Sequence, residues 1–430
     1  MKIFIKDIAQ FKGKKVTLCG WIFNFRSSGG IYFLQIRDGS GFIQAVVDRS
    51  KVEKKTWEIC QKISLETSAV IEGKVSQHPT KKEIFEIQVE KIKIIQIADR
   101  YPLGKKSHGP EFLLDHRHLW LRSKRQWAIQ KIRYTLIKAT YQWLTNHYFI
   151  KIDAPILTPI ACEGTTTLFG LKYFDLGKAY LSQSGQLYLE AAIFAHNRVF
   201  DFGPVFRAEK SKTRRHLTEF WMMDAEMAFV EHQENMKFQE KLIVYLVKEV
   251  LKNNQKELEI LERDIEPLKK IKPPFPRITY QEAIEKLKKK GVKIKYGDDF
   301  GGDEETILSQ LYDRPLFIEK YPAKLKAFYM KPDPKDKKLV LNDDLLAPEG
   351  YGEIIGGSQR EEDYQNLLKR LKENNLSPKE FQWYLDLRKY GSVPHSGFGY
   401  GLERIVAWLC GLKHVREAIP FPRLLNRLRP

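Results

Sequence analysis

The chain has 430 residues, of which 43% are hydrophobic and 12% aromatic, so it is long and apolar enough for two or more folded domains. Its 73 lysines and arginines exceed its 54 aspartates and glutamates, and the net charge of +19 favours a polyanionic partner, unless the chain simply comes from a lysine-rich proteome. The four cysteines stand singly and no run of about 18 apolar residues occurs, which excludes a disulfide framework, a cysteine-based metal site and a membrane span and predicts a cytoplasmic protein.

Short strands dominate the first 100 residues. Alternating apolar and polar residues predict strands over residues 16–25, 31–36, 42–47, 69–75 and 84–97, with a helix over 51–65. Gly39 and Gly41 mark one turn and Pro79 another. Several short strands with one interposed helix are typical of a small Greek-key barrel, so we expect an OB-fold β-barrel over residues 1–100.

The rest of the chain mixes helices and strands. Residues 101–115 contain proline and glycine and are interpreted as a linker. Helices are expected over residues 124–147, 232–261, 279–290 and 402–411, and strands over 149–155, within 180–230, and over 316–329, 339–346 and 352–355. These elements predict an α+β domain over residues 116–430, and the Lys/Glu-rich stretch at about 232–300 is interpreted as a helical insertion on it.

One face of the predicted barrel carries an aromatic residue among polar ones. Phe33 and Gln35 fall on the same side of their strand, Gln44 lies on the next strand, and Arg26 lies just before. Such a face can stack one splayed base, hydrogen-bond base edges and contact a phosphate. The alternative is that Phe33 belongs to the core and Gln35 is an ordinary surface residue.

Two segments of the second domain carry the residues most suggestive of chemistry. One reads FRAE at residues 206–209 and continues as RHLTEF at 215–220, and the other reads GFGYGLER at 397–404. Neither is a Walker phosphate loop or a dinucleotide fingerprint. They place arginines on predicted strands and a glycine-rich strand before a helix, while Asp343, Asp344 and Glu353 supply carboxylates suited to Mg²⁺. Each arginine alone could be a surface ion pair, but their joint occurrence in this order favours a nucleotide triphosphate site.

These segments resemble motifs 2 and 3 of the class II aminoacyl-tRNA synthetases, and the first domain resembles the anticodon-binding barrel of their class IIb members. The resemblance extends from about residue 15 to the end of the chain. It implies a catalytic antiparallel sheet flanked by helices, amino-acid activation with ATP and Mg²⁺, and transfer to tRNA. Pro155 matches motif 1, which implies a homodimer through that region.

The resemblance also implies roles for individual residues. Arg207, Arg404 and Glu353 are the candidate catalytic residues: Arg207 would bridge the α-phosphate and the substrate carboxylate, Arg404 would hold the γ-phosphate, and Glu353 would bind Mg²⁺. The further candidate ATP contacts are Glu209 and Phe220 for adenine, Arg215 and His216 for the γ-phosphate side, and Leu217 and Gly401. Gly397, Gly399 and Gly401 would let the backbone approach the nucleotide. In the barrel, Phe33 would stack on the central anticodon uridine and Gln44 would hydrogen-bond it, with Arg26 and Gln35 beside them.

The segment Ser182 to Glu190 bears on the amino-acid substrate. Leu189 stands where aspartyl enzymes carry a lysine that pairs with the second substrate carboxylate, and an unpaired buried ammonium would be costly with a neutral carboxamide. Asp224 and Glu226 share one strand face, so one of them could accept from a carboxamide NH₂ while Arg360 donates to its oxygen. The remaining candidate amino-acid contacts, for the α-ammonium, are Glu163 and Gln186. The resemblance therefore points to the asparaginyl branch of the family, with asparagine, ATP and tRNA-Asn as partners.

Three alternatives stay open. The first is an aspartyl enzyme, possibly one that charges both tRNA-Asp and tRNA-Asn, against which Leu189 argues. The second is a synthetase-like paralogue that makes free asparagine from aspartate and ammonia, against which the presence of the barrel argues. The third is an RNA-binding module alone, which the joint presence of Arg207, Glu353 and Arg404 disfavours.

Overall fold

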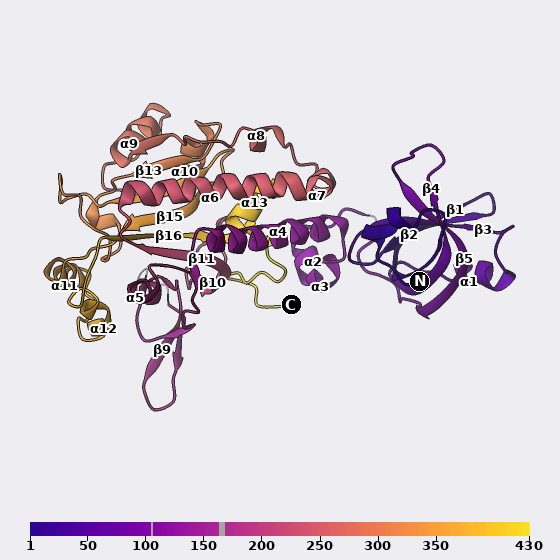
Figure 1. Cartoon of the computed structure of the whole chain (residues 1–430), viewed down its shortest axis with the longest axis horizontal. Helices are drawn as coiled ribbons and strands as arrows, with labels where there is room; N and C mark the ends of the chain where they lie inside the picture. The colour runs from indigo at the N-terminus through magenta and orange to yellow at the C-terminus, as the bar shows by residue number, and fades with distance from the viewer. Residues whose placement is uncertain (105, 163–167) are drawn as a thin grey trace. The chain divides into compact units, whose positions relative to one another are not determined.

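The computed structural model describes residues 1–104, 106–162 and 168–430, and the chain divides into two compact units, residues 1–109 and 110–430 (Figure 1). Each unit contains its own cluster of buried hydrophobic residues, as expected of a domain.

The first unit is the predicted OB-fold barrel. Its strands are β1 (Lys15–Ser28), β2 (Ile31–Arg37), β3 (Phe42–Asp48), β4 (Thr67–Gln77) and β5 (Phe85–Gln96), preceded by the 3-10 helix η1 (Ile5–Phe11). They close in the order β1-β2-β3-β5-β4, with β3 and β5 parallel. Helix α1 (Lys54–Gln61) lies between β3 and β4 and is shorter than predicted. Leu18, Leu34 and Ile87 point into the barrel and are fully buried, because alternate residues of each strand face its interior.

An eight-stranded sheet forms the frame of the second unit. Its order is β12-β13-β14-β15-β16-β11-β10-β6, antiparallel except for parallel pairs at its two ends. The strands are β6 (Ile150–Lys151), β10 (Arg198–Phe206), β11 (Glu219–Ala228), β12 (Arg277–Thr279), β13 (Leu316–Glu319), β14 (Asn342–Ala347), β15 (Gly352–Gln359) and β16 (His395–Gly401). A small sheet of β7 (Leu157–Thr158), β9 (Lys178–Leu181) and β8 (Gly170–Lys172) projects from it (Figure 1). The predicted α+β class is confirmed.

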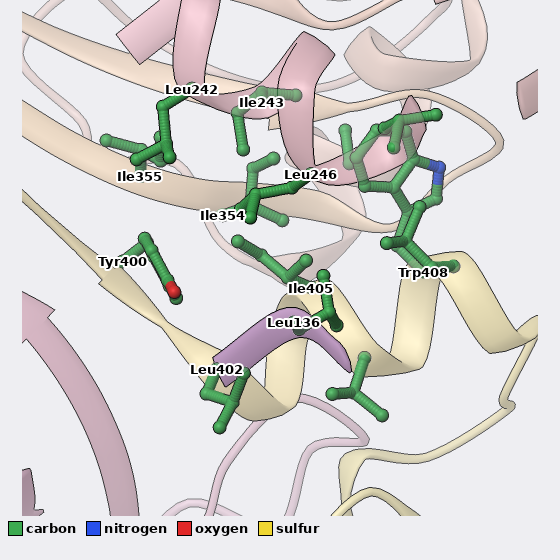
Figure 2. Close-up of a cluster of buried hydrophobic side chains, with 14 of the residues drawn as sticks. Leu136, Leu242, Ile243, Leu246, Ile354, Ile355, Tyr400, Leu402, Ile405 and Trp408 are labelled. Carbon is green, nitrogen blue, oxygen red and sulfur yellow. The ribbon is translucent and has the colours of Figure 1, made fainter. Parts of the chain in front are cut away.

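Helices α4 (Lys124–Asn146), α6 (His232–Asn253) and α13 (Leu402–Cys410) cover one face of this sheet (Figure 1). Figure 2 shows Leu136 of α4, Leu246 of α6, Ile354 of β15 and Ile405 of α13 converging in the core between them. Ser123 caps α4 by accepting a hydrogen bond from the backbone of Gln126. The opposite face of the central strands is left for polar residues.

The other helices of the described residues lie around the sheet. They are α2 (Pro110–Asp115), α3 (Arg117–Trp120), α5 (Gln186–His196), α7 (Gln255–Ile260), α8 (Glu266–Lys269), α9 (Tyr280–Lys289), α10 (Gly302–Gln310), α11 (Tyr364–Glu373) and α12 (Gln382–Asp386), with 3-10 turns η3 (Ala323–Leu325) and η4 (Val415–Glu417). Within the described part of the chain, no helix is long and apolar enough to cross a membrane.

The interpretation of residues 232–300 as an insertion is wrong for α6 and β12. Met236, Leu242 and Leu246 of α6 belong to the main core, and β12 pairs with β13 at the end of the large sheet. Lysines and glutamates on the outer side of α6 obscure its apolar stripe, which is the part that packs.

Candidate active site

A cavity of about 560 Å³ lies on the sheet face opposite α4 and α6, over the neighbouring strands β14, β15, β16 and β11. Strand alternation explains the choice of face: Phe398 and Tyr400 point into the helical core, whereas Gly399 and Gly401 line the cavity. The predicted site residues that line it are Gln186, Arg207, Glu209, Arg215, His216, Leu217, Phe220, Asp224, Glu353, Arg360, Gly401 and Arg404. Folding therefore brings the two sequence segments together around one cavity.

Strands β11 and β16 are in register such that two carboxylates lie opposite two glycines. Asp224 pairs with Gly399, and Glu226 pairs with Gly397. A Cβ atom on Gly397 would lie 1.9 Å from Glu226 Oε1, and one on Gly399 would lie 2.4 Å from Asp224 Oδ1. The missing side chains of these two glycines therefore make room for the neighbouring carboxylates, and their approach to the nucleotide stays a prediction. At Gly401 the nearest atom to an added Cβ is 3.8 Å away, on Phe220.

Paired charges surround the end of the cavity near α13. Arg404 Nη1 donates to the Glu353 carboxylate at 2.9 Å and to its backbone carbonyl at 3.0 Å. Arg215 Nη1 donates to Glu305 at 2.7 Å, and Arg215 Nη2 donates to the carbonyl of Gly350 at 2.7 Å. Burial and the nearby charge of Glu353 raise the pKa of Glu305 to about 7. For Glu353 itself, burial opposes ionisation, but Arg404 and Lys326 hold its pKa below the ordinary value.

Sequence reasoning missed Glu305, because it lies on α10 in a stretch that matches no motif. Its carboxylate accepts from the backbone N–H of Glu353 at 3.0 Å as well as from Arg215, so it connects two of the predicted ATP contacts. The acidic first turn of α10, Asp303 to Glu305, gave no sign of a site, since acidic residues are common at helix N-termini.

The basic loop before β11 contributes a histidine to the cavity. His216 Nε2 lies 3.4 Å from Glu209 Oε2, and burial together with the charge of Arg404 lowers the pKa of His216. Arg207 is held at the end of β10 by a backbone hydrogen bond to the carbonyl of Thr218 at 3.0 Å. An electropositive rim of this kind, with Phe220 beside it, can receive a planar base followed by phosphates.

The other end of the cavity is a small polar pocket. Arg360 forms a close ion pair with Glu226 and also donates to Ser358 Oγ at 2.5 Å. Both side chains are almost fully buried; burial raises the pKa of Glu226, while the paired Arg360 favours its ionised form. Asp224 accepts from Ser184 Oγ at 2.8 Å and from the backbone N–H of Gly185 at 2.9 Å.

Besides Glu226, which does not itself line the cavity but pairs with Arg360, three other predicted residues lie away from the cavity or outside the described residues. Leu189 is fully buried in an apolar cluster with Ile193 and Val199 and does not line the cavity, which corrects its prediction as a substrate contact. Its side chain packs in that cluster although it lies only three residues after Gln186 on α5. Glu163 lies outside the described residues. Of the two weaker Mg²⁺ candidates, Asp344 lines the cavity, whereas Asp343 lies 3.5 Å from His232 of α6, on the other face of the sheet.

Two family models match the chain. One, described as tRNA synthetases class II (D, K and N), matches residues 109–425, and the other, described as OB-fold nucleic acid binding domain, matches residues 16–95. The chain belongs to the class II tRNA synthetases.

Solved structures of class II synthetases resemble it over its full length. The asparaginyl-tRNA synthetase from Pyrococcus horikoshii complexed with asparaginyl-adenylate is 48% identical, with a TM-score of 0.96 and 100% of both chains covered. The Entamoeba histolytica asparaginyl-tRNA synthetase in complex with asparaginyl-adenylate is 32% identical over 100% of this chain and 99% of that one, with a TM-score of 0.91. An aspartyl tRNA synthetase from Entamoeba histolytica is 30% identical over 100% and 93%, with a TM-score of 0.84.

The barrel of this class II synthetase gathers the four predicted anticodon contacts on one face. The Arg26 guanidinium lies 4.6 Å from the centre of the Phe33 ring, and Gln35 is the cross-strand partner of Gln44. Gln44 Nε2 donates to Glu86 at 3.2 Å. Phe33 is half-buried, lies outside the barrel's core cluster and carries the Arg26 guanidinium over its ring.

Proposed function

We propose that this class II synthetase is an asparagine–tRNA ligase, which forms asparaginyl-adenylate from asparagine and ATP and then transfers asparagine to the terminal 3′-hydroxyl of tRNA-Asn. The observation that carries the proposal is the buried Arg360–Glu226 pair, of which Arg360 lines the cavity. It sets a donor beside an acceptor, and a carboxamide needs one of each. The likeness to two synthetases solved with asparaginyl-adenylate supports the same substrate.

Activation requires the asparagine carboxylate to attack the α-phosphate of ATP. Positioning and charge neutralisation dominate such a reaction, so no protein nucleophile is needed. Arg207 lines the cavity and would bridge the α-phosphate and the carboxylate. Arg215, His216 and Arg404 would neutralise the β- and γ-phosphates, while Phe220 and Glu209 would receive adenine.

Discrimination against aspartate follows from Glu226. The carboxamide NH₂ of asparagine can donate to this carboxylate while Arg360 donates to the amide oxygen. An aspartate carboxylate in the same place would set two acceptors against each other in a buried pocket. Polar complementarity of this kind can exceed a factor of about 10⁴ without editing.

The residues at the other end of the cavity fit Mg²⁺. Glu353, Asp344 and Glu305 all line the cavity, and their carboxylate oxygens are the ligand type that Mg²⁺ prefers. The raised pKa of Glu305 reflects burial and crowded negative charge beside Glu353. Among the described residues no group of three or more His, Cys, Asp or Glu could hold a metal by itself, which suits an ion that shares its ligands with phosphates. Bound there, it would neutralise phosphate charge, with Glu353 as its main protein ligand.

The remaining parts of the proposal concern partners. The face formed by Arg26, Phe33, Gln35 and Gln44 would read the anticodon. A homodimer would form around Pro155, where Tyr148, Ile150, Ile156 and Leu157 leave apolar side chains exposed. The protein would act in the cytoplasm.

The test is ATP–pyrophosphate exchange by the purified protein with asparagine or aspartate, each with and without tRNA-Asn. We expect asparagine to drive exchange at least about a hundredfold better than aspartate. Exchange driven mainly by aspartate would make this an aspartyl enzyme. Ammonia-dependent release of free asparagine would identify it instead as the amide-forming paralogue.

A further inference from the structure

A buried carboxylate stands directly behind the amino-acid pocket. Glu190 lies one turn after Gln186 on α5, and its Oε1 accepts from Gln186 Nε2 at 3.1 Å. Its Oε2 receives three groups: Tyr384 OH at 2.6 Å, Arg388 Nη2 at 2.7 Å and His395 Nε2 at 3.1 Å. The side chains of Glu190, Arg388 and His395 are 0% exposed. Burial opposes ionisation of Glu190, but the charge of Arg388 and the hydrogen bond with His395 outweigh it and lower its pKa.

Gln186 connects this network to the cavity, because it lines the cavity while its amide nitrogen is bonded to Glu190. A carboxylate can only accept hydrogen bonds, so it dictates which end of a neighbouring amide faces it. The nitrogen end of Gln186 is turned to Glu190, which leaves the carbonyl Oε1 as the end that a cation in the cavity can meet.

We propose that Glu190 is a positioning residue that fixes the amide of Gln186 with its carbonyl oxygen toward the α-ammonium of the amino-acid substrate. The inference rests on the proposed function only in taking an amino acid as the ligand of this pocket. Either asparagine or aspartate would carry the ammonium.

The geometry predicts what Glu190→Gln would do. Two of the groups around Oε2, the Arg388 guanidinium and the Tyr384 hydroxyl, donate to it, so the new amide must place its oxygen there. Its NH₂ would then face Gln186, whose amide would have to turn over to accept from it. Gln186 would present its own NH₂ to the substrate ammonium, and attraction would become repulsion.

The test compares two ligands that differ only in the ammonium: asparagine and succinamic acid, which is asparagine without its α-amino group. Binding of each to the full-length protein is measured by calorimetry. We expect Glu190→Gln to weaken the binding of asparagine at least about tenfold and to change the binding of succinamic acid by less than about twofold. The double variant Gln186→Glu/Glu190→Gln restores an acceptor toward the ammonium and should bind asparagine within about threefold of the wild type.

Two further variants serve as controls. Tyr384→Phe removes one donor to Oε2 but leaves the contact with Gln186, so asparagine binding should change less than about twofold. Glu190→Asp keeps the charge opposite Arg388 but shortens the side chain. As a more conservative change it should also weaken the binding of asparagine and not that of succinamic acid. Equal weakening of both ligands, or failure of the double variant to recover asparagine, would overturn the proposal. If the wild type prefers aspartate, the proposed function fails, and aspartate against succinic acid tests the positioning role unchanged.

Discussion

In the proposed function, the choice of amino acid depends on Glu226. Its charge is buried, and Arg360 is its close ionic partner, so a substrate group that enters must satisfy both. A carboxamide can do so with one donor and one acceptor, and a carboxylate cannot.

Glu226→Gln is therefore expected to relax specificity. The glutamine has the same size beside Gly397 but can donate to an aspartate carboxylate. We expect the ratio of kcat/KM for asparagine to that for aspartate in pyrophosphate exchange to fall at least roughly tenfold. The KM for ATP is the internal control and should not move. An unchanged ratio would show that discrimination resides elsewhere.

The side chain of Glu305 makes the stability of the folded protein depend on pH. Its pKa rises from an ordinary value of 4.5 to about 7 on folding, because burial and the charge of Glu353 disfavour ionisation. Folding therefore favours its protonated form, and that stabilisation is complete below about pH 4.5 and is lost as the pH rises through about 7. Glu305→Gln keeps a neutral group at every pH. Its Tm minus that of the wild type should increase between pH 5 and pH 8, by an amount equivalent to no more than about 3 kcal/mol.

At this scale the sequence predicted the residues within motifs and missed those between them. Arg207, Arg215 and Arg404 were found because they lie in segments with a recognisable order. Glu305 lies between the motifs and Glu190 at the end of one, and the contacts of both with distant residues are encoded by no local pattern. Leu189 was misplaced because a position in a motif does not say which way a helical side chain turns.

Among the elements, the β11–β16 pair does most to shape the pocket. Gly203→Ala and Gly397→Ala make the same change in one sheet with different surroundings. At Gly203 the nearest atom to an added Cβ is 3.9 Å away, whereas at Gly397 Glu226 Oε1 is at 1.9 Å. We expect Gly397→Ala to cost at least about 2 kcal/mol in the free energy of unfolding and to abolish asparagine binding. Gly203→Ala should differ little from the wild type in denaturant titrations, and equal effects would refute the steric account.

Elements with strong periodicity were predictable, and their packing partners were not. The α4 prediction over residues 124–147 differs from the observed Lys124–Asn146 by one residue, since the apolar spacing marks the helix. The α6 helix was also found, but its charged face suggested a peripheral insertion, and only the structure shows the other face in the core. The burial of α6 depends on the sheet that it covers. Because the strands of that sheet are far apart in sequence, the local sequence of α6 does not reveal its packing.

In the proposed function, the second unit carries the chemistry and the barrel reads the anticodon. Phe33→Ala is expected to raise the KM for tRNA-Asn in aminoacylation roughly tenfold, because a stacked base is lost. Pyrophosphate exchange without tRNA should be unaffected, since that reaction needs only the second unit. Phe4→Ala is the matched control, because Phe4 is an exposed aromatic of the same unit outside the Arg26–Phe33 face. A fall in both activities with Phe33→Ala would point to a folding defect.

The ion pairs of the cavity have a consequence for how ATP would bind in the proposed function. Arg404 is already paired with Glu353 and Arg215 with Glu305, so a triphosphate would meet these two arginines with counter-ions in place. When ATP binds, its phosphate oxygens would replace the carboxylates as counter-ions of the two arginines. The net Coulomb gain is then the difference between the arginine–phosphate and arginine–carboxylate interactions. Two displaced carboxylates then lie beside a polyanion in a partly buried space. A divalent cation would reduce the repulsion between these carboxylates and the phosphates. This gives the cavity a physical reason to bind ATP as its magnesium complex.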